Sequence, residues 1–147
     1  MIQHPEFTPA PTTEVPGPDL FMTVIRVADW PKTLDWYVET LGLLAILTDV
    51  ERQFALLAAG NGRLALQGGL APEEPILPGR VRLVFQVPDV DRERQRLIGR
   101  GLEIGPPVEH AREGYREIRL HDPEGTPLTL FSWIEPARGR RSGDPPE

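Results

Sequence analysis

Residues 24–29, Val-Ile-Arg-Val-Ala-Asp, have a counterpart at residues 84–89, Val-Phe-Gln-Val-Pro-Asp. Each stretch begins with an apolar run that is typical of a β-strand and ends on an aspartate. An aspartate at this place can accept hydrogen bonds from the free amides of a following helix, so each stretch predicts a strand that leads into a helix. The chain therefore contains an internal repeat with an offset of 60 residues.

The segments that follow the two aspartates support the repeat. After Asp29, apolar residues recur at the spacing of one helix face as far as Leu41, and Gly42 fits a left-handed C-terminal cap. The helix predicted after Asp89 carries more charge and is closed by Gly101. Three short strands are then expected in each half, at residues 43–48, 53–58 and 63–67 and at residues 102–108, 115–121 and 126–133.

The last predicted hairpin is the clearest local signal. Its turn, Asp122-Pro123-Glu124-Gly125, has proline at the second position and a glycine that accepts a positive φ. With Gly125 as a bulge, Asp122 lies opposite Thr126, and the register then pairs Arg119 with Thr129.

The composition shifts at both ends of the chain. Residues 1–18 and 136–147 contain few apolar side chains, and we expect both to be disordered tails. Residues 69–79, rich in glycine and proline, are expected to connect module one (residues 19–68) with module two (residues 80–135) in a single domain.

Charge and residue usage exclude several classes of protein. The chain has 147 residues, with 16 Lys and Arg against 22 Asp and Glu, and this acidic balance argues against nucleic-acid binding. No cysteine is present, which excludes disulfides and thiolate metal sites. No apolar run is long enough to span a bilayer and no secretory signal is visible, so we expect a cytoplasmic protein that does not bind membranes.

These motifs resemble those of the vicinal oxygen chelate superfamily, which includes glyoxalase I, extradiol dioxygenases and bleomycin-resistance proteins. The resemblance rests on the two βαβββ modules, on Val-Ala-Asp, Trp-Tyr and Leu-Gly at residues 27–29, 36–37 and 41–42, and on the turn at residues 122–125. It implies an α+β fold in which mixed sheets curl around a cleft, and it implies a homodimer.

The resemblance also implies four metal-ligand positions, which fall on Met22, Ala65, Arg82 and Thr129. A hard divalent ion requires oxygen or imidazole donors, and of these four side chains only the threonine offers an oxygen. The positive charge of Arg82 would repel the ion. We therefore expect no metal and no other cofactor; Gln67 and Gln86, two residues away, would be weak ligands.

Side chains alternate across a strand, so the strand pattern predicts which residues face the cleft. The ligand-binding residues predicted in this way are Arg26, Gln67, Arg82, Gln86, Tyr115, Glu117, Arg119, Phe131 and Trp133. Arginines suit a carboxylate or phosphate, and flat rings suit an aromatic or sugar-like body. The alternative is that Glu117 pairs with one arginine, the other polar groups are solvated and the rings belong to the core.

The remaining aromatic and histidine residues are assigned simpler roles. Trp36 and Tyr37 are expected to pack or to contact a second subunit. His110 is expected in a loop and His121 at a turn; a role for His121 as a proton shuttle would need a partner that the sequence does not identify.

The sequence favours a metal-independent small-molecule binding protein that sequesters an amphipathic, aromatic or anionic ligand. The alternative is an enzyme, a lyase, isomerase or dioxygenase with a non-standard site in which Glu117 acts as a base. A protein-interaction module also remains open.

Overall fold

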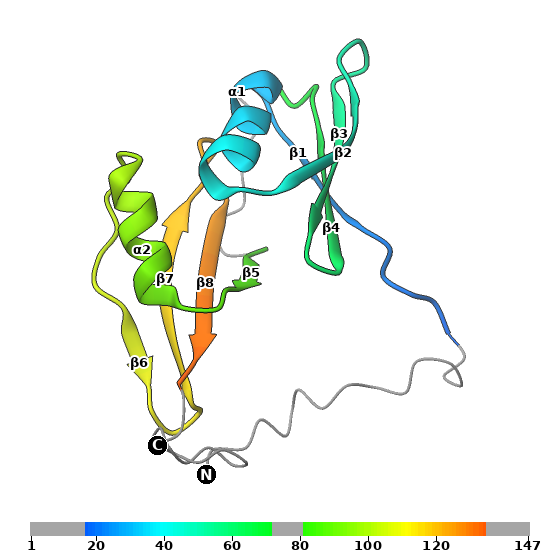
Figure 1. Ribbon diagram of the computed structural model, residues 1–147. Helices are drawn as coiled ribbons and strands as arrows, with labels where there is room; N and C mark the ends of the chain where they lie inside the picture. Colours follow the sequence, from blue (N-terminus) through cyan, green and yellow to red (C-terminus); the bar gives the residue numbers. More distant parts are fainter. Residues whose placement is uncertain (1–16, 72–80, 135–147) are drawn as a thin grey trace.

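Two four-stranded mixed sheets form most of the computed structural model, which describes residues 17–71 and 81–134 (Figure 1). Their strand orders are β1-β4-β3-β2 and β5-β8-β7-β6, and the first strand of each sheet pairs in parallel with the last. The predicted pair of βαβββ modules is confirmed. The predicted tails and connector lie mostly outside the described residues.

Module one begins with a strand and a capped helix, as predicted. The Asp29 carboxylate accepts a hydrogen bond from the amide of Lys32 at 3.2 Å, and Gly42 has a φ of 95°. The prediction of one α-helix up to Leu41 is only partly right, because the second half is a π-helix whose last turn is closed by the Gly42 amide on the Tyr37 carbonyl. The elements are β1 (Thr23–Arg26), α1 (Trp30–Asp35), η2 (Trp36–Leu41), β2 (Leu44–Asp49), β3 (Phe54–Ala59) and β4 (Gly62–Gln67).

Module two repeats this plan. Asp89 caps its helix by accepting from the amides of Asp91 and Arg92. The hairpin register is the predicted one, with Arg119 opposite Thr129. The elements are β5 (Leu83–Gln86), α2 (Val90–Gly99), β6 (Val108–His110), β7 (Tyr115–His121) and β8 (Pro127–Trp133).

The strand predicted at residues 102–108 is wrong. The strand β6 begins only at Val108, because Pro106 and Pro107 have no amide hydrogen to donate to a ladder. Before the prolines, the carbonyls of Ile104 and Gly105 accept hydrogen bonds from the Arg94 side chain instead.

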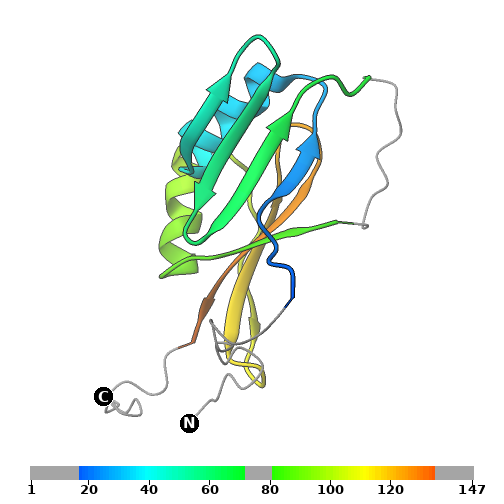
Figure 2. The ribbon, with the colours of Figure 1, turned by 90° about the vertical axis from the view of Figure 1, so that its right-hand side faces the viewer.

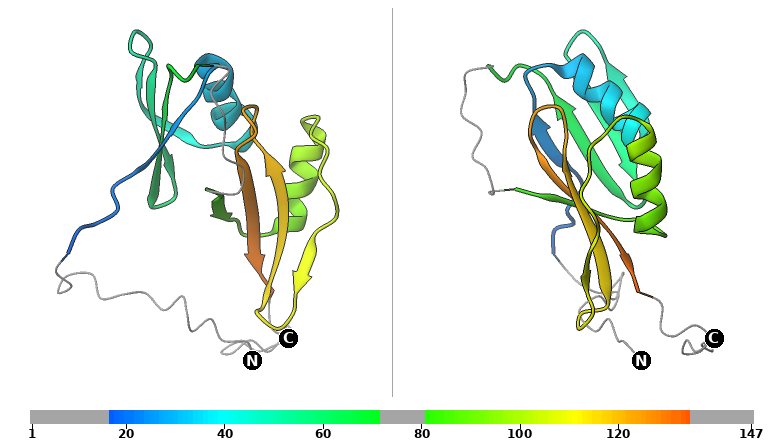
Figure 3. Two further views of the ribbon diagram at one scale, coloured as in Figure 1. Left: turned by 180° about the vertical axis from the view of Figure 1, so that it is seen from behind. Right: turned by 90° about the vertical axis from the view of Figure 1, so that its left-hand side faces the viewer.

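In each module a helix packs on one face of the sheet, and the two modules share one core. Figure 2 shows the sheet of module one in front of its helix, and Figure 3 shows the two modules side by side from behind. A single cluster of buried apolar side chains contains residues of both modules, among them Tyr37 of module one and Leu97 of module two. None of the helices in residues 17–71 and 81–134 has the length and apolar character needed to cross a membrane.

The turn before β8 holds the two modules together. The Tyr37 hydroxyl donates to Asp122 Oδ2 at 2.6 Å, and burial, followed by the nearby Asp122 charge, raises the pKa of Tyr37 far above its usual range. The carboxylate of Glu124 accepts hydrogen bonds from the amides of Ala28 and Asp29, both at 2.9 Å. These contacts fix the start of the first helix against module two. We name this set of contacts, made by Tyr37, Ala28, Asp29, Asp122 and Glu124, the intermodule clamp.

Candidate functional site

The face of the second sheet that lies away from α2 carries the candidate site. Ile118, Leu128 and Leu130 point into the core, where they are 1–2% exposed. Because side chains alternate across a strand, Glu117 and Phe131 face the other way. This outer face brings together most of the residues that the strand pattern predicted in module two.

Three aromatic rings gather at one end of this face. The Tyr115 and Trp133 rings meet edge-on with their centroids 6.3 Å apart, and both pack edge-on against Phe131, at 5.9 and 5.2 Å. The strand pairing explains this contact, since Tyr115 lies opposite Trp133 on the neighbouring strand. All three rings are only half-buried, so they are not simply part of the core.

A buried carboxylate lies beside the rings. Glu117 is 4% exposed, and its Oε2 accepts a hydrogen bond from Arg119 Nε at 3.1 Å. The same oxygen lies 3.2 Å from Nε2 of His110, whose ring stacks on Tyr115. Glu117 therefore enters the site with its negative charge already paired to an arginine, one of the alternatives that the sequence left open.

These groups surround a pocket of about 170 Å³. Arg82 lies at its rim, exposed, and among the described residues its guanidinium has no ion-pair partner. Thr129 lies in the wall, and its buried hydroxyl has no hydrogen-bond partner within that same part of the chain. The pocket is lined by Arg82, Val84, Tyr115, Glu117, Thr129, Phe131 and Trp133.

The other predicted ligand-binding residues lie outside this pocket. Arg26 and Gln67 sit side by side on β1 and β4 of module one, where Arg26 donates to the Gly69 carbonyl at 3.0 Å. Gln86 borders a separate groove of about 630 Å³ between the modules. Arg119 reaches the site only through Glu117, and its own side chain is 62% exposed.

His110 was not among the predicted site residues. It was expected in a loop, but it ends β6 and pairs with Tyr115 in the ladder, which carries its ring to Glu117. A strand at residues 108–110 in register with β7 would have revealed the contact. His121 is exposed at the end of β7.

The four expected metal-ligand positions do not form a metal site. Ala65 is fully buried opposite Val24 and offers no donor atom, and Thr129 shares its pocket with the cationic Arg82. Glu117 is the carboxylate that lines this pocket, and Arg119 and His110 already engage it. Within residues 17–71 and 81–134, no cluster of three or more His, Asp or Glu side chains could hold an ion. The residues present do not fit the metal that the resemblance implies.

The comparison with protein families agrees with this architecture. A model described as the Glyoxalase/Bleomycin resistance protein/Dioxygenase superfamily matches residues 19–130. The chain belongs to this superfamily. The match spans both modules, including the clamp and most of the candidate site.

Solved structures show the same superfamily fold at low sequence identity. The antibiotic binding protein TnmS3 from Streptomyces sp. CB03234 is 24% identical, with a TM-score of 0.67 over 82% of this chain and 99% of that one. The lactoylglutathione lyase from Agrobacterium tumefaciens is 14% identical, with a TM-score of 0.63 over 80% and 96%. A glyoxalase/bleomycin resistance protein/dioxygenase from Nocardioides is 22% identical, with a TM-score of 0.64 over 92% and 91%. A search of curated proteins gave no match.

Proposed function

We propose that this superfamily member binds a small organic molecule in the module-two pocket and uses no metal ion there. The pocket itself carries the proposal, because half-buried rings line one hollow with an arginine and a hydroxyl that have no partner among residues 17–71 and 81–134. Convergent polar groups in a mainly apolar hollow are typical of ligand sites. The antibiotic binding protein TnmS3 has the same fold, so the fold is compatible with such a binding function.

Ligand binding can be followed through Trp133, because its ring lines the pocket. We expect a saturable change in tryptophan fluorescence on titration with a library of small aromatic and amphipathic compounds. The variant Trp133→Phe should lose the signal and keep the fold, whereas Trp36→Phe, a change on η2 in module one, should keep the signal. A chain that gives no saturable response to any compound, by fluorescence or by ligand-observed NMR, contradicts the proposal.

The absence of a metal requirement is tested by elemental analysis. Untagged protein dialysed against Ni, Zn, Mn and Fe(II) should retain far less than one ion per chain, because the four expected positions offer a single hydroxyl oxygen. Retention of about one ion per chain contradicts the proposal and makes chelator-sensitive turnover the next assay.

The second candidate is a lyase, isomerase or dioxygenase-like enzyme, which the contact between His110 and Glu117 favours. A buried carboxylate 3.2 Å from an imidazole nitrogen can pass a proton to or from a bound molecule. Arg119 already donates to the same carboxylate oxygen that lies near His110, so we rank this candidate second. Turnover that is lost in Glu117→Gln and in His110→Gln, and that chelators leave unchanged, would reverse this ranking.

We also propose that the protein forms a homodimer through module one. Its outer sheet face exposes large apolar side chains, which on a monomer would face water. The strand β2 lies at the edge of this sheet and is free on one side among the described residues.

A further inference from the structure

Building on the proposed function, we infer that the module-two pocket selects a single aromatic ring that carries an anionic group, as in an arylcarboxylate. The inference deepens the proposal by naming the chemical class of the ligand. It follows from the charge, the size and the unused hydrogen-bonding groups of the pocket.

The charge of the pocket favours an anion. Glu117 is neutralised by Arg119, whose Nη2 lies 3.0 Å from Glu117 Oε2. Arg82, at the rim, then contributes a positive charge that no described residue compensates. A carboxylate can accept two parallel hydrogen bonds from a guanidinium, whereas a cationic ligand would be repelled by Arg82.

The size and shape of the pocket favour one ring. Its volume is about 170 Å³, close to that of a cavity of roughly 150 Å³ that is known to take up benzene. Tyr115, Phe131 and Trp133 line the hollow and pack edge-on against one another, and offset or edge-on contacts are those that a further aromatic ring prefers.

The Thr129 hydroxyl provides a second polar contact. Thr129 is 2% exposed, and its hydroxyl has no hydrogen-bond partner among the described residues. A buried hydroxyl without a partner lowers the stability of the folded protein. An anionic group that displaces the side chains covering this hydroxyl would accept its hydrogen bond. Arg82 and Thr129 thus define the polar end of the pocket, and the rings define its apolar end.

Three probes separate the contributions of ring and charge. Benzoate has both, benzamide has the ring without the charge, and acetate has the charge without the ring. Binding is measured by tryptophan fluorescence and by ligand-observed NMR at constant ionic strength. We expect benzoate to bind at least about tenfold more tightly than either other probe, because hydrogen bonds to a charged group are the stronger kind.

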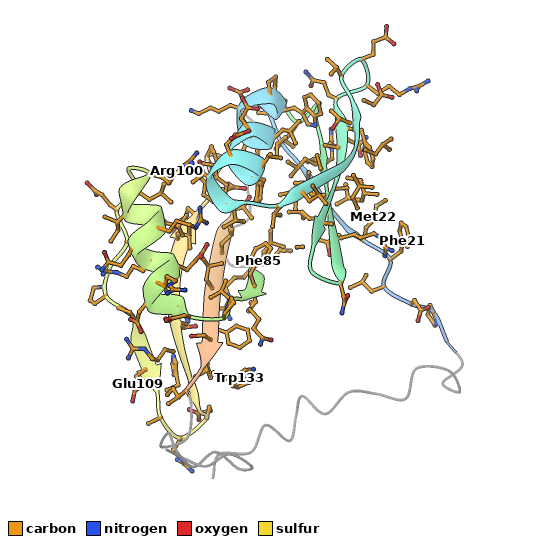
Figure 4. The ribbon with its side chains drawn as sticks, viewed as in Figure 1. Phe21, Met22, Phe85, Arg100, Glu109 and Trp133 are labelled. Carbon is orange, nitrogen blue, oxygen red and sulfur yellow. The ribbon has the colours of Figure 1, made fainter. Side chains whose placement is uncertain are left out.

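Two pocket variants and one control complete the experiment. Arg82→Gln and Thr129→Val should each weaken benzoate binding, the first by about tenfold or more, and each should weaken benzamide binding less than benzoate binding. Arg100→Gln is the matched control, because Arg100 lies at the end of α2, far from Trp133 (Figure 4). It should leave binding of all three probes unchanged.

The outcomes distinguish a failure of the selection for an anionic aromatic ligand from a failure of ligand binding itself. Benzamide binding as tightly as benzoate, or Arg82→Gln leaving benzoate affinity unchanged, overturns the selection of an anion and leaves the binding function standing. Tighter binding of acetate than of benzoate overturns the requirement for a ring. If none of these probes and no library compound perturbs the Trp133 signal, the proposed function fails with it.

Discussion

Thr129 and Thr33 both have a buried hydroxyl without a hydrogen-bond partner in the described part of the chain, but only Thr129 lines the pocket. Valine has nearly the same shape as threonine but carries no hydroxyl. Replacing either residue by valine therefore removes the unsatisfied polar group. We expect each change to raise the free energy of unfolding by about 1 kcal/mol. Urea denaturation of each variant and of the parent chain measures this change in the free energy of unfolding.

A loss of stability in Thr129→Val would show that its hydroxyl has a partner and would weaken the case for an anion contact. Thr33→Val is the control, since it should raise stability in the same way without affecting benzoate binding. A gain of stability that accompanies a loss of affinity only at Thr129 would mark a residue retained for binding.

Tyr37 makes stability depend on alkaline pH. Its folded-state pKa is raised by burial, while the unfolded chain ionises near pH 10. A raised folded pKa gives stability that is fully present below the unfolded pKa and is lost as the pH rises above it. We expect the free energy of unfolding to fall by about 1.4 kcal/mol per pH unit above pH 10.

The variant Tyr37→Phe separates this effect from other alkaline titrations. It should lose about 1–3 kcal/mol at pH 8, because Asp122 loses a donor. Above pH 10 its stability should fall less steeply than that of the parent chain. Guanidinium unfolding at a series of pH values measures the stability of both proteins. If the stability of both falls equally steeply above pH 10, Tyr37 is not buried and neutral.

At the scale of elements, the C-terminal cap of the first helix fixes its end. Gly42 has a φ of 95°, a conformation that other residues adopt at a cost. Gly42→Ala should lower the free energy of unfolding by about 1 kcal/mol, although a Cβ there meets no atom. Gly99→Ala, in open space at the end of α2, should be neutral or stabilising. Thermal unfolding of both variants tests this, and equal losses would contradict it.

The elements that local sequence signals define were predictable. The Asp29 and Asp89 caps and the turn before Thr126 follow from side-chain chemistry within a few residues, and the turn also fixes the register that joins Tyr115 to Trp133. The start of β6 was predicted wrongly although Pro106 and Pro107 mark it in the sequence. What no local pattern shows is that the Arg94 side chain bonds the carbonyls before these prolines.

The candidate site was predictable only in part, as were the elements. Strand alternation placed Tyr115, Glu117, Phe131 and Trp133 on one face, because alternation needs only the register. It did not show His110, whose position depends on β6. Nor did it show that Arg26 would instead bond the Gly69 carbonyl, since a side chain on the predicted face can still bond elsewhere.

At the scale of the whole molecule, the clamp joins the two modules through hydrogen bonds. Glu124→Ala removes both acceptors for the amides of Ala28 and Asp29. We expect a loss of about 1–3 kcal/mol, with a single cooperative transition retained. Glu103→Ala, an exposed change in module two, should cost little. A Glu124→Ala protein as stable as the parent chain would show that the clamp is dispensable.

The exposed apolar face of module one predicts association. Ile46 and Leu47 on β2 are 52% and 53% exposed. Light scattering after size exclusion should give the mass of a dimer, and Leu47→Glu should shift it toward the monomer because a charge in an apolar contact must be desolvated. A monomeric parent chain at micromolar concentration would contradict the homodimer.

The pocket is formed by one continuous half of the chain, from Arg82 to Trp133, and the clamp joins that half to the other through the side chains of Asp122 and Glu124. No clamp residue lines the pocket, so substitutions along the pocket walls leave the join intact. A library that randomises Val84, Phe131 and Trp133 could therefore be screened for new ligands while residues 19–71 are held constant. Within one small chain, module one can thus stay unchanged while the pocket of module two is engineered to bind other ligands.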